Sequence, residues 1–398
     1  MRESKLELLI RDPGPDGHGF RIETVPSGPV YAGYRPKRVD EGMYESASEL
    51  SPVDGKRYYL LKAAGSDKYL ALTEREHFLW EQMDGVRDIK DIASLYFFEF
   101  GSLDFSGVRA LLHRLSEAGL VKLTPASRLR VAADRSEGAL ARAFRRLTGL
   151  LEFRIEDADG WVTRLYEGGG YMLVSKYAMA FYALISLLGI TAFGRFERLG
   201  MFPYELFFSH PLAVIAVVIS SFYPVMAAHE LFHALACKGR GRKVSGFGFA
   251  FWDGFYPSFY TDVSDIYLSP RRERLFVSLA GPLSTTAIAS VFFLPALMFP
   301  EAAVSDTFYE VGRLNLLVGM VALYPFQFIK MDGYYILVDI LGFPGLRERS
   351  FAFVKGLPGF VRSGKPFTYA EAVMTGYVVM CVLSIAALFL LVAAATAA

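Results

Sequence analysis

Long apolar stretches alternate with short charged ones over the second half of the chain. Five of them are long and apolar enough to cross a bilayer as helices, at 177–194, 211–237, 275–299, 311–329 and 369–395. The pattern predicts a mainly α-helical fold in which residues 176–398 form a polytopic membrane helix bundle of about five spans.

The first half of the chain shows the shorter periods of a small soluble domain. Residues 1–49 are rich in glycine, proline and charge, which favours an irregular N-terminal arm. In the domain that follows, residues 50–125, strand-like runs at 58–61 and 68–72 flank a Gly-Ser-Asp turn and predict a hairpin.

Three helices are predicted after this hairpin. Thr73 and Glu76 match a capping box, which marks a helix start, and amphipathic patterns follow at 89–93 and 108–120. A hairpin followed by three helices gives the domain a winged-helix-like α+β order. The last helix carries few arginines, which disfavours a DNA-recognition role.

Residues 126–175 form a basic linker between the two halves. Within it, residues 139–153 alternate arginine with leucine, alanine and phenylalanine, so they can form a basic amphipathic helix. Such a helix either lies on the inner membrane surface or packs as a solvated helix on the soluble domain, and the sequence favours neither arrangement.

Composition and charge support a membrane protein. The chain is 53% hydrophobic and 21% charged, which is too apolar for a typical soluble protein, and its net charge of +1 implies no general affinity for nucleic acid. Lysine and arginine gather in loops 238–274 and 343–368, whereas loops 195–210 and 300–310 contain only two arginines. The positive-inside rule therefore predicts an integral membrane protein whose N-terminal domain is cytoplasmic.

The candidate chemistry centres on His229-Glu230-Leu231-Phe232-His233, which lies inside one of the apolar stretches. Helical spacing places the two imidazoles one turn apart on one face, where they can bind one Zn²⁺. Glu230 can then act as general base on a zinc-bound water. A histidine is more often a satisfied core residue, but a glutamate between two histidines in an apolar segment is costly without compensation, and zinc is the simplest compensation.

A catalytic zinc site also needs a third protein ligand. No histidine follows the motif, so the ligand has to be a carboxylate, and Asp332 beside Gly333 lies just after the fourth apolar stretch on the predicted side of the histidines. Its other role would be an N-cap for a helix at 333–340, which is compatible with ligation. Asp339 is predicted to be structural or to support the ligands, and whether 333–342 form a separate half-helix stays open.

An HExxH in one span and an Asp-Gly in a later span resembles the site-2 protease family of intramembrane zinc metalloproteases. The branch called peptide zinc metalloproteases is similar over about residues 150–355, through His229-Glu230-x-x-His233-Ala234, Phe259-Tyr260-Thr261-Asp262-Val263-Ser264-Asp265, Ala280-Gly281-Pro282-Leu283, Asp332-Gly333-Tyr334-Tyr335-Ile336-Leu337 and Leu346-Arg347-Glu348-Arg349-Ser350. The resemblance implies that His229, His233 and Asp332 hold Zn²⁺ and that Glu230 is the general base. The expected location is a bacterial inner or cell membrane.

The chain departs from this family shortly before the Asp-Gly pair. Many members have an asparagine and then a proline there, and the asparagine helps to hold the oxyanion. This chain has Tyr324-Pro325-Phe326-Gln327 instead. Either Gln327 or Tyr324 could take over that role, and the sequence does not decide between them.

Residues 50–125 resemble the PqqD-like peptide-recognition domains. The matching residues are Tyr69-Leu70-x-Leu72, Leu79-Trp80, Asp84-Gly85, Ile89, Ile92-Ala93 and Leu115 through Gly119-Leu120-Val121. Domains of this family bind a leader or substrate peptide along a strand edge. The alternatives are a structural winged helix or a DNA-binding one.

A second hairpin is predicted close to the site. Two aromatic runs between residues 244 and 265 are separated by Trp252-Asp253-Gly254, which is a turn signal. The edge of this hairpin can pair with an extended substrate, or the hairpin can serve only as an aromatic anchor in the membrane interface. Asp262 and Asp265 are predicted to be turn or supporting residues rather than metal ligands.

Taken together, the residues and the resemblance predict an intramembrane zinc metalloprotease with a cytoplasm-facing site. Its partners would be a peptide or membrane-protein substrate and the lipid bilayer, with no nucleic acid. The alternative is a membrane-bound peptide-binding or export component that keeps the fold without cleaving, although the intact motif and Asp332 argue against it. A zinc-regulated transporter is disfavoured because the sequence shows no inverted repeats.

Overall fold

The computed structural model of the chain divides into two units, which are described separately. Unit 1 contains residues 1–49 and 56–136, and unit 2 contains residues 50–55 and 137–398. The residues that the structure describes are 6–12, 19–25, 35–64, 69–101, 105–122, 152–155, 157–198, 211–252, 256–299, 305–326, 330–364 and 366–397.

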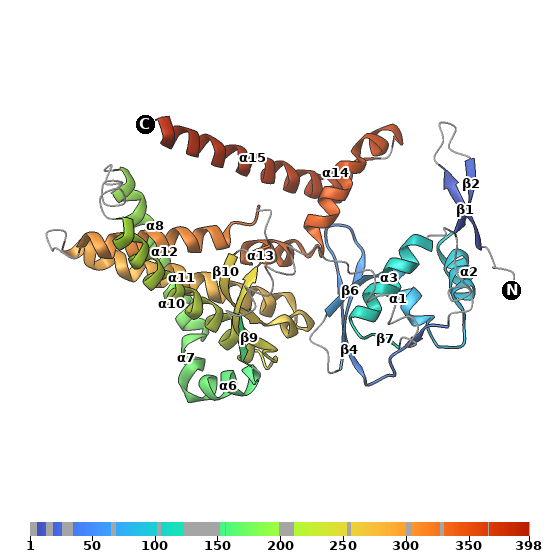
Figure 1. Ribbon diagram of the computed structural model, residues 1–398, viewed down its shortest axis with the longest axis horizontal. Coiled ribbons are helices and arrows are strands. Elements are labelled where there is room, and N and C mark those ends of the chain that lie inside the picture. The colour runs from blue at the N-terminus through green and yellow to red at the C-terminus, as the bar shows by residue number, and fades with distance from the viewer. Residues whose placement is uncertain are drawn as a thin grey trace. The chain divides into compact units, whose positions relative to one another are not determined.

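Unit 1 combines a small sheet with three helices. The sheet has the order β4–β5–β6, with β4 (Tyr44–Leu50), β5 (Arg57–Ala63) and β6 (Tyr69–Thr73), and the helices are α1 (Glu74–Glu81), α2 (Ile89–Phe100) and α3 (Phe105–Glu117). β5 and β6 pair antiparallel, which confirms the predicted hairpin and the three helices after it (Figure 1). Leu61, Leu72, Trp80 and Leu115 form the centre of its apolar core.

The first of these helices starts where the sequence predicts. The Thr73 hydroxyl accepts a hydrogen bond from the Glu76 N–H (3.3 Å), and the Glu76 carboxylate accepts one from the Thr73 N–H (2.8 Å). This reciprocal pair is the predicted capping box, which satisfies two backbone donors at the helix start.

The irregular arm predicted for residues 1–49 is wrong. The structure places there an antiparallel hairpin of β1 (Leu6–Asp12) and β2 (Gly19–Val25), then β3 (Lys37–Arg38), which pairs with β7 (Val121–Lys122), and then β4. The sequence alternates apolar and polar residues over Phe20-Arg21-Ile22-Glu23 in β2 and over Leu6-Glu7-Leu8 in β1, where Leu9 and Ile10 extend the apolar run. This two-residue period favours strands and outweighs the glycine and proline content of the arm.

Unit 2 is mainly helical. Its helices are α6 (Ala158–Leu165), α7 (Tyr171–Leu173), α8 (Lys176–Arg198), α10 (Pro211–Lys238), α11 (Arg271–Met298), α12 (Ser305–Leu323), α13 (Asp332–Leu341), α14 (Leu346–Arg362) and α15 (Tyr369–Ala397), with a π-helical turn at Tyr166–Gly170 and a 3-10 turn at Ser264–Leu268. α11 lies at the centre, in contact with α8, α10, α12 and α13 (Figure 1). This central position allows α11 to shape the surroundings of the histidine helix α10.

Three helices of the described part are long and apolar enough to cross a membrane. These segments are Lys176–Phe193, Arg271–Phe293 and Tyr369–Ala387, in α8, α11 and α15. The other two predicted spans are helical as well, as α10 and α12, but they are not among the three, and α12 ends at Leu323 instead of 329. The count of five spans therefore stays a prediction.

The predicted linker is not a separate segment at its C-terminal end. Residues 139–151 of the predicted basic helix lie outside the described residues, and β8 (Phe153–Ile155) begins where that helix would end. Ala158 and Val162 of α6 are buried in one apolar cluster with α10 and α11 residues, so this part belongs to the helical unit. The linker prediction failed here because the apolar face of α6 is buried by α10 and α11, which are distant from it in the sequence.

Candidate metal centre

The two histidines of the HExxH motif lie on the C-terminal half of α10. His229 is 2% exposed and His233 is 6% exposed, and the four residues from Ala234 to Cys237 that follow are fully buried. One helical turn separates the histidines, so both rings leave the same face of α10. Their neighbours on α11 then determine how each ring is oriented.

Each ring is held through its Nδ1 atom by α11. His233 Nδ1 lies 2.7 Å from the Val277 carbonyl oxygen, and His229 Nδ1 lies 2.9 Å from Thr285 Oγ1. Because a carbonyl oxygen can only accept, His233 Nδ1–H is the donor, which leaves the lone pair on Nε2. The Thr285 hydroxyl can accept from Nδ1–H of the same tautomer of His229 or donate to Nδ1 of the other one. Second contacts of this kind are typical of metal-binding histidines, whose free nitrogen faces the ion.

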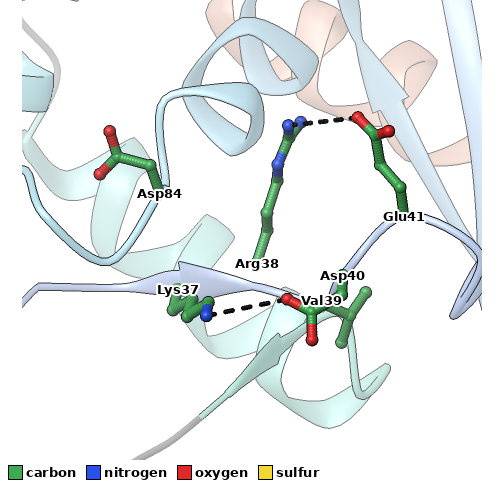
Figure 2. Close-up of a pocket in the computed structure, with 6 residues that line it drawn as sticks. All are labelled: Lys37, Arg38, Val39, Asp40, Glu41 and Asp84. Atoms are coloured by element: carbon green, nitrogen blue, oxygen red, sulfur yellow. Dashed lines mark ion pairs between the residues drawn. The ribbon is translucent and has the colours of Figure 1, made fainter.

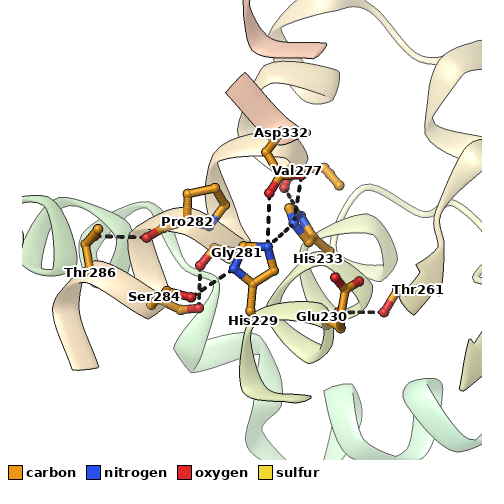
Figure 3. Close-up of polar contacts among 11 residues, drawn as sticks. His229, Glu230, His233, Thr261, Val277, Gly281, Pro282, Ser284, Thr286 and Asp332 are labelled. Atoms are coloured by element: carbon orange, nitrogen blue, oxygen red, sulfur yellow. Dashed lines mark hydrogen bonds and ion pairs between the residues drawn. The ribbon is translucent and has the colours of Figure 1, made fainter. Parts of the chain in front are cut away.

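Asp332 is the carboxylate that meets the two rings. Its Oδ2 atom lies 3.0 Å from His229 Nε2, and its Oδ1 atom lies 3.4 Å from His233 Nε2. It is the first residue of α13, which is a separate helix, as the sequence left open. The N-cap position belongs to Met331, so Asp332 does not take the alternative role of a cap, and its side chain is directed to the histidines (Figure 3).

The three side chains fit a tetrahedral zinc ion. The two Nε2 atoms are 3.2 Å apart, which lies between the two Asp332 distances. Zinc bonds of 2.0–2.2 Å at tetrahedral angles require about 3.3 Å between ligand atoms. Among the residues that the structure describes, this is the one group of such side chains whose ligand atoms lie within 4.8 Å of one another.

Gly281 of α11 leaves open the space into which these atoms point. A β-carbon added at this glycine would lie 2.3 Å from His233 Nε2 and 2.7 Å from His229 Nε2. Both separations are shorter than non-bonded atoms tolerate. Because Gly281 has no side chain, both nitrogens can lie close to its backbone, and any other residue would push the rings out of place.

Glu230 lies between the two histidines in the sequence and next to a three-stranded sheet of unit 2. This sheet has the order β10–β9–β8, with β9 (Gly246–Trp252) and β10 (Tyr256–Asp262), so the predicted hairpin is confirmed. The Thr261 hydroxyl of β10 donates to the Glu230 carbonyl oxygen (2.9 Å) (Figure 3). Since β8 pairs with the other side of β9, β10 is an edge strand of this sheet and lies against the HExxH helix.

The other acidic residues predicted near the site have structural partners. Asp262 accepts a hydrogen bond from the Ser264 N–H (3.1 Å), as a turn residue does, and Asp265 pairs with Arg242 (2.9 Å). Asp339 is buried and pairs with Arg274 at 2.7 Å. None of the three belongs to the metal group, in agreement with the prediction that they are turn or supporting residues.

Of the two residues predicted to hold an oxyanion, Tyr324 lies in the described part of the chain. Gln327 lies outside the described residues. The Tyr324 hydroxyl forms a hydrogen bond with the Ser384 hydroxyl of α15. This contact links the end of α12 to α15 and gives Tyr324 a structural partner.

The C-terminal end of the histidine helix is tied to α6 by a charged contact. Asp159 accepts hydrogen bonds from Lys238 Nζ (2.8 Å) and from the Val244 N–H (2.9 Å). Burial raises the pKa of the Asp159 carboxyl, but these hydrogen bonds and the Lys238 charge outweigh it and hold the pKa below its usual range. The carboxylate is therefore ionised at neutral pH and fixes the last residue of α10.

Unit 1 contains a cavity that is lined mainly by charged side chains. A cavity of about 300 Å³ is lined by Lys37, Arg38, Val39, Asp40, Glu41 and Asp84 (Figure 2). Its charges pair internally, Lys37 with Asp40 at 3.7 Å and Arg38 with Glu41 at 3.9 Å. Because both signs of charge line the cavity, it favours no particular class of ligand.

Several residues that shape the metal centre were missed by reasoning from the sequence. Thr285 and the Val277 carbonyl orient the rings, and Gly281 provides the space. Only Gly281 left a signal, because it lies in one of the motifs that carry the family resemblance. A threonine in an apolar helix leaves none, since its hydroxyl can bond to its own backbone.

Comparison with known proteins gives no match: no protein-family model, no curated protein and no solved structure matches the chain. A function therefore has to be argued from the chemistry of this site.

Proposed function

We propose that the chain is an intramembrane zinc metalloprotease of the site-2 protease type. The observation that carries the proposal is the meeting of His229 Nε2, His233 Nε2 and the Asp332 carboxylate at 3.0–3.4 Å, in a unit with three helices apolar enough to span a membrane. Three protein ligands with one position left for water or substrate are typical of catalytic zinc. A structural site would have four protein ligands.

In the proposed mechanism, His229, His233 and Asp332 hold the ion and Glu230 moves the proton. When bound, zinc supplies Lewis acidity to a water molecule and to the scissile carbonyl. Glu230, one residue after the first histidine, takes a proton from the attacking water and passes it to the leaving amine. The Val277 carbonyl keeps His233 in the tautomer that presents Nε2, and Thr285 orients the His229 ring through its Nδ1 atom.

The substrate in this proposal is an extended segment of a peptide or membrane protein. A helical segment hides its carbonyls in its own hydrogen bonds, so the segment has to unwind before hydrolysis. The edge strand β10 lies against α10 through the Thr261–Glu230 contact and offers backbone groups for pairing. Pairing there would bring the scissile bond close to Glu230.

The proposal includes five spans and a site open to the cytoplasm, which can be tested by labelling. With Cys237 and Cys381 replaced, single cysteines at Lys243 and Ser363 should be protected from an impermeant thiol reagent in intact cells. A cysteine at Ser305 should react, because the positive-inside rule places that loop outside. Lys243 and Ser363 are exposed and avoid the positive φ angles of Gly241 and Gly364. Labelling of the Lys243 position from outside would overturn the orientation and the cytoplasmic site together.

Unit 1 is proposed to recognise the substrate at the edge of β6 that faces away from β5. The Ala71 carbonyl accepts a hydrogen bond from Arg114 Nη2 (2.8 Å), which indicates that the backbone groups of Ala71 face away from β5. Ala71→Pro should therefore remove a donor that a bound peptide needs while keeping the β5–β6 ladder. Ala71→Ser keeps the donor and is the matched control.

We expect Ala71→Pro to keep its zinc, to cleave a short generic peptide normally and to slow cleavage of the natural substrate severalfold. Loss of one hydrogen bond corresponds to about 0.5–1.5 kcal/mol, or roughly 2- to 13-fold. The measurement is kcat/KM for both peptides, with Ala71→Ser beside it. Equal losses for both peptides would show that the edge supports the fold and does not select the substrate.

The experiment that tests the function itself is substrate capture. A Glu230→Gln chain should bind its substrate without cutting it, so the captured peptide can be identified and then offered to the unmodified chain. New N-termini, detected by mass spectrometry, are the expected result. Capture without cleavage by the zinc-loaded, unmodified chain would favour the alternative, a peptide-binding or export component.

A further inference from the structure

A buried ion pair connects α11 and α13 at a distance from the metal centre. Arg274 Nε lies 2.7 Å from Asp339 Oδ1, and the two side chains are 13% and 7% exposed. Arg274 Nη1 also donates to the Ser269 carbonyl oxygen (3.0 Å), which fixes the guanidinium at the start of α11. The mechanism assigns no role to this pair.

On both helices, the residue of the ion pair and the residue at the metal centre are separated by the same number of positions. Arg274 and Gly281 are two turns apart on α11, and Asp332 and Asp339 are two turns apart on α13. Seven residues of helix span about 10 Å, so each helix carries two contact points at the same separation. Asp339 meets Arg274, while Asp332 meets the histidine nitrogens beside Gly281. The two helices therefore run antiparallel, with one register that satisfies both contacts.

Metal binding requires that α13, which carries Asp332, is placed correctly against α11. α11 orients both histidine rings and supplies the glycine, whereas Asp332 comes from α13. At its start, α13 is held closely, since a β-carbon at Gly333 would lie 2.1 Å from the Leu323 carbonyl oxygen of α12. That contact limits how closely α13 approaches α12. The rotation of α13 about its own axis and its position along α11 need a second contact as an anchor.

We propose that the Arg274–Asp339 pair is this anchor, and that both residues are positioning residues for the third metal ligand. The inference rests on the proposed metal site and goes beyond it by assigning a role to a pair that contacts neither metal nor substrate. Buried ion pairs are directional, and removal of one partner leaves an unpaired charge that forces the helices to rearrange. A rotation or shift of α13 moves the Asp332 carboxylate away from the Nε2 atoms.

The test is metal affinity, measured on the full chain by competition with a chelator. Arg274→Gln and Asp339→Asn should each weaken zinc binding by about 10- to 100-fold, the usual effect of losing a contact behind a metal ligand. Arg274→Lys keeps the charge and should retain more of the affinity than Arg274→Gln. The exchange of Arg274→Asp with Asp339→Arg should recover part of the loss, because it restores the pair in reverse.

A spectroscopic readout separates positioning from general destabilisation. With Co²⁺ in place of zinc, the visible spectrum reports the coordination geometry, so it should change in Arg274→Gln and Asp339→Asn. The matched control is Arg242→Gln, which breaks the Arg242–Asp265 pair (2.9 Å) in the same unit, where neither residue belongs to α11 or α13. This control should lower thermal stability while keeping the affinity and the Co²⁺ spectrum.

Two outcomes would overturn the inference. The first is unchanged metal affinity and spectrum in both Arg274→Gln and Asp339→Asn. The second is an equal loss in Arg242→Gln, which would show that any broken ion pair loosens the unit. Failure of the proposed metal site would look different, because the unmodified chain would then bind no zinc at all. Failure of the proposed catalysis would leave zinc affinity intact and abolish only cleavage.

Discussion

Glu230→Gln should leave about one Zn²⁺ bound per chain and lower peptide cleavage by a factor of about 10² to 10⁴, the usual contribution of a general base. His229→Ala, His233→Ala and Asp332→Ala should each lose most of the metal, because each removes one of the three converging ligand atoms. A Glu230→Gln variant that keeps its metal but loses turnover would identify Glu230 as the base rather than a ligand. Metal analysis of the purified variants and kcat/KM on one peptide measure the two quantities.

His113→Ala is the matched control for the histidine variants. This residue lies on α3 in unit 1, where its exposed ring is 3.8 Å from Glu117, and it has no place in the metal group. Its replacement should change neither the metal content nor cleavage. Full zinc and activity in Asp332→Ala would mean that the third ligand lies elsewhere. An unmodified chain without metal would mean that the cluster is held by ion pairs between charged imidazole and carboxylate.

The sequence predicts those parts of the site whose geometry depends on residues close together in the chain. Two histidines four residues apart share a helix face wherever that helix lies, so His229 and His233 could be paired from spacing alone. Asp332 is 103 residues from His229, and its assignment came from the lack of another histidine, from the predicted membrane side and from the family resemblance. Its contact with both rings agrees with that assignment.

The parts that the sequence did not predict depend on packing between distant segments. The role of Thr285 exists only because α11 lies against α10 at one rotation, and an isolated threonine in an apolar run carries no sign of it. The pairing of Asp339 with Arg274 requires the antiparallel register of α11 and α13, which no local pattern encodes. The β1–β2 hairpin is the opposite case, because its two-residue period is a local pattern that could have predicted it. The prediction of an irregular arm gave more weight to the glycine and proline content.

Gly281→Ala should remove the metal centre while leaving the helices in place. The added β-carbon would lie 2.3 Å from His233 Nε2, closer than non-bonded atoms can approach, so the ring has to move out of its position. A displacement of about 1 Å at a reacting centre costs on the order of 10²-fold in rate. In a helix interior, alanine is favoured over glycine by about 0.5–1 kcal/mol, so the backbone itself should tolerate the change. We expect strongly reduced zinc content and cleavage, with normal helical circular dichroism.

Gly376→Ala separates this steric effect from a general effect of replacing glycine in a helix. Gly376 lies in α15, and a β-carbon there would meet nothing within 4 Å. This variant should keep zinc, cleavage and helical content, and gain slightly in stability through helix propensity. Measured side by side, the two alanine variants differ only in what surrounds the new methyl group. Full zinc content in Gly281→Ala would show that the histidines can rearrange around the methyl group, and the close approach to Gly281 would then not be needed for metal binding.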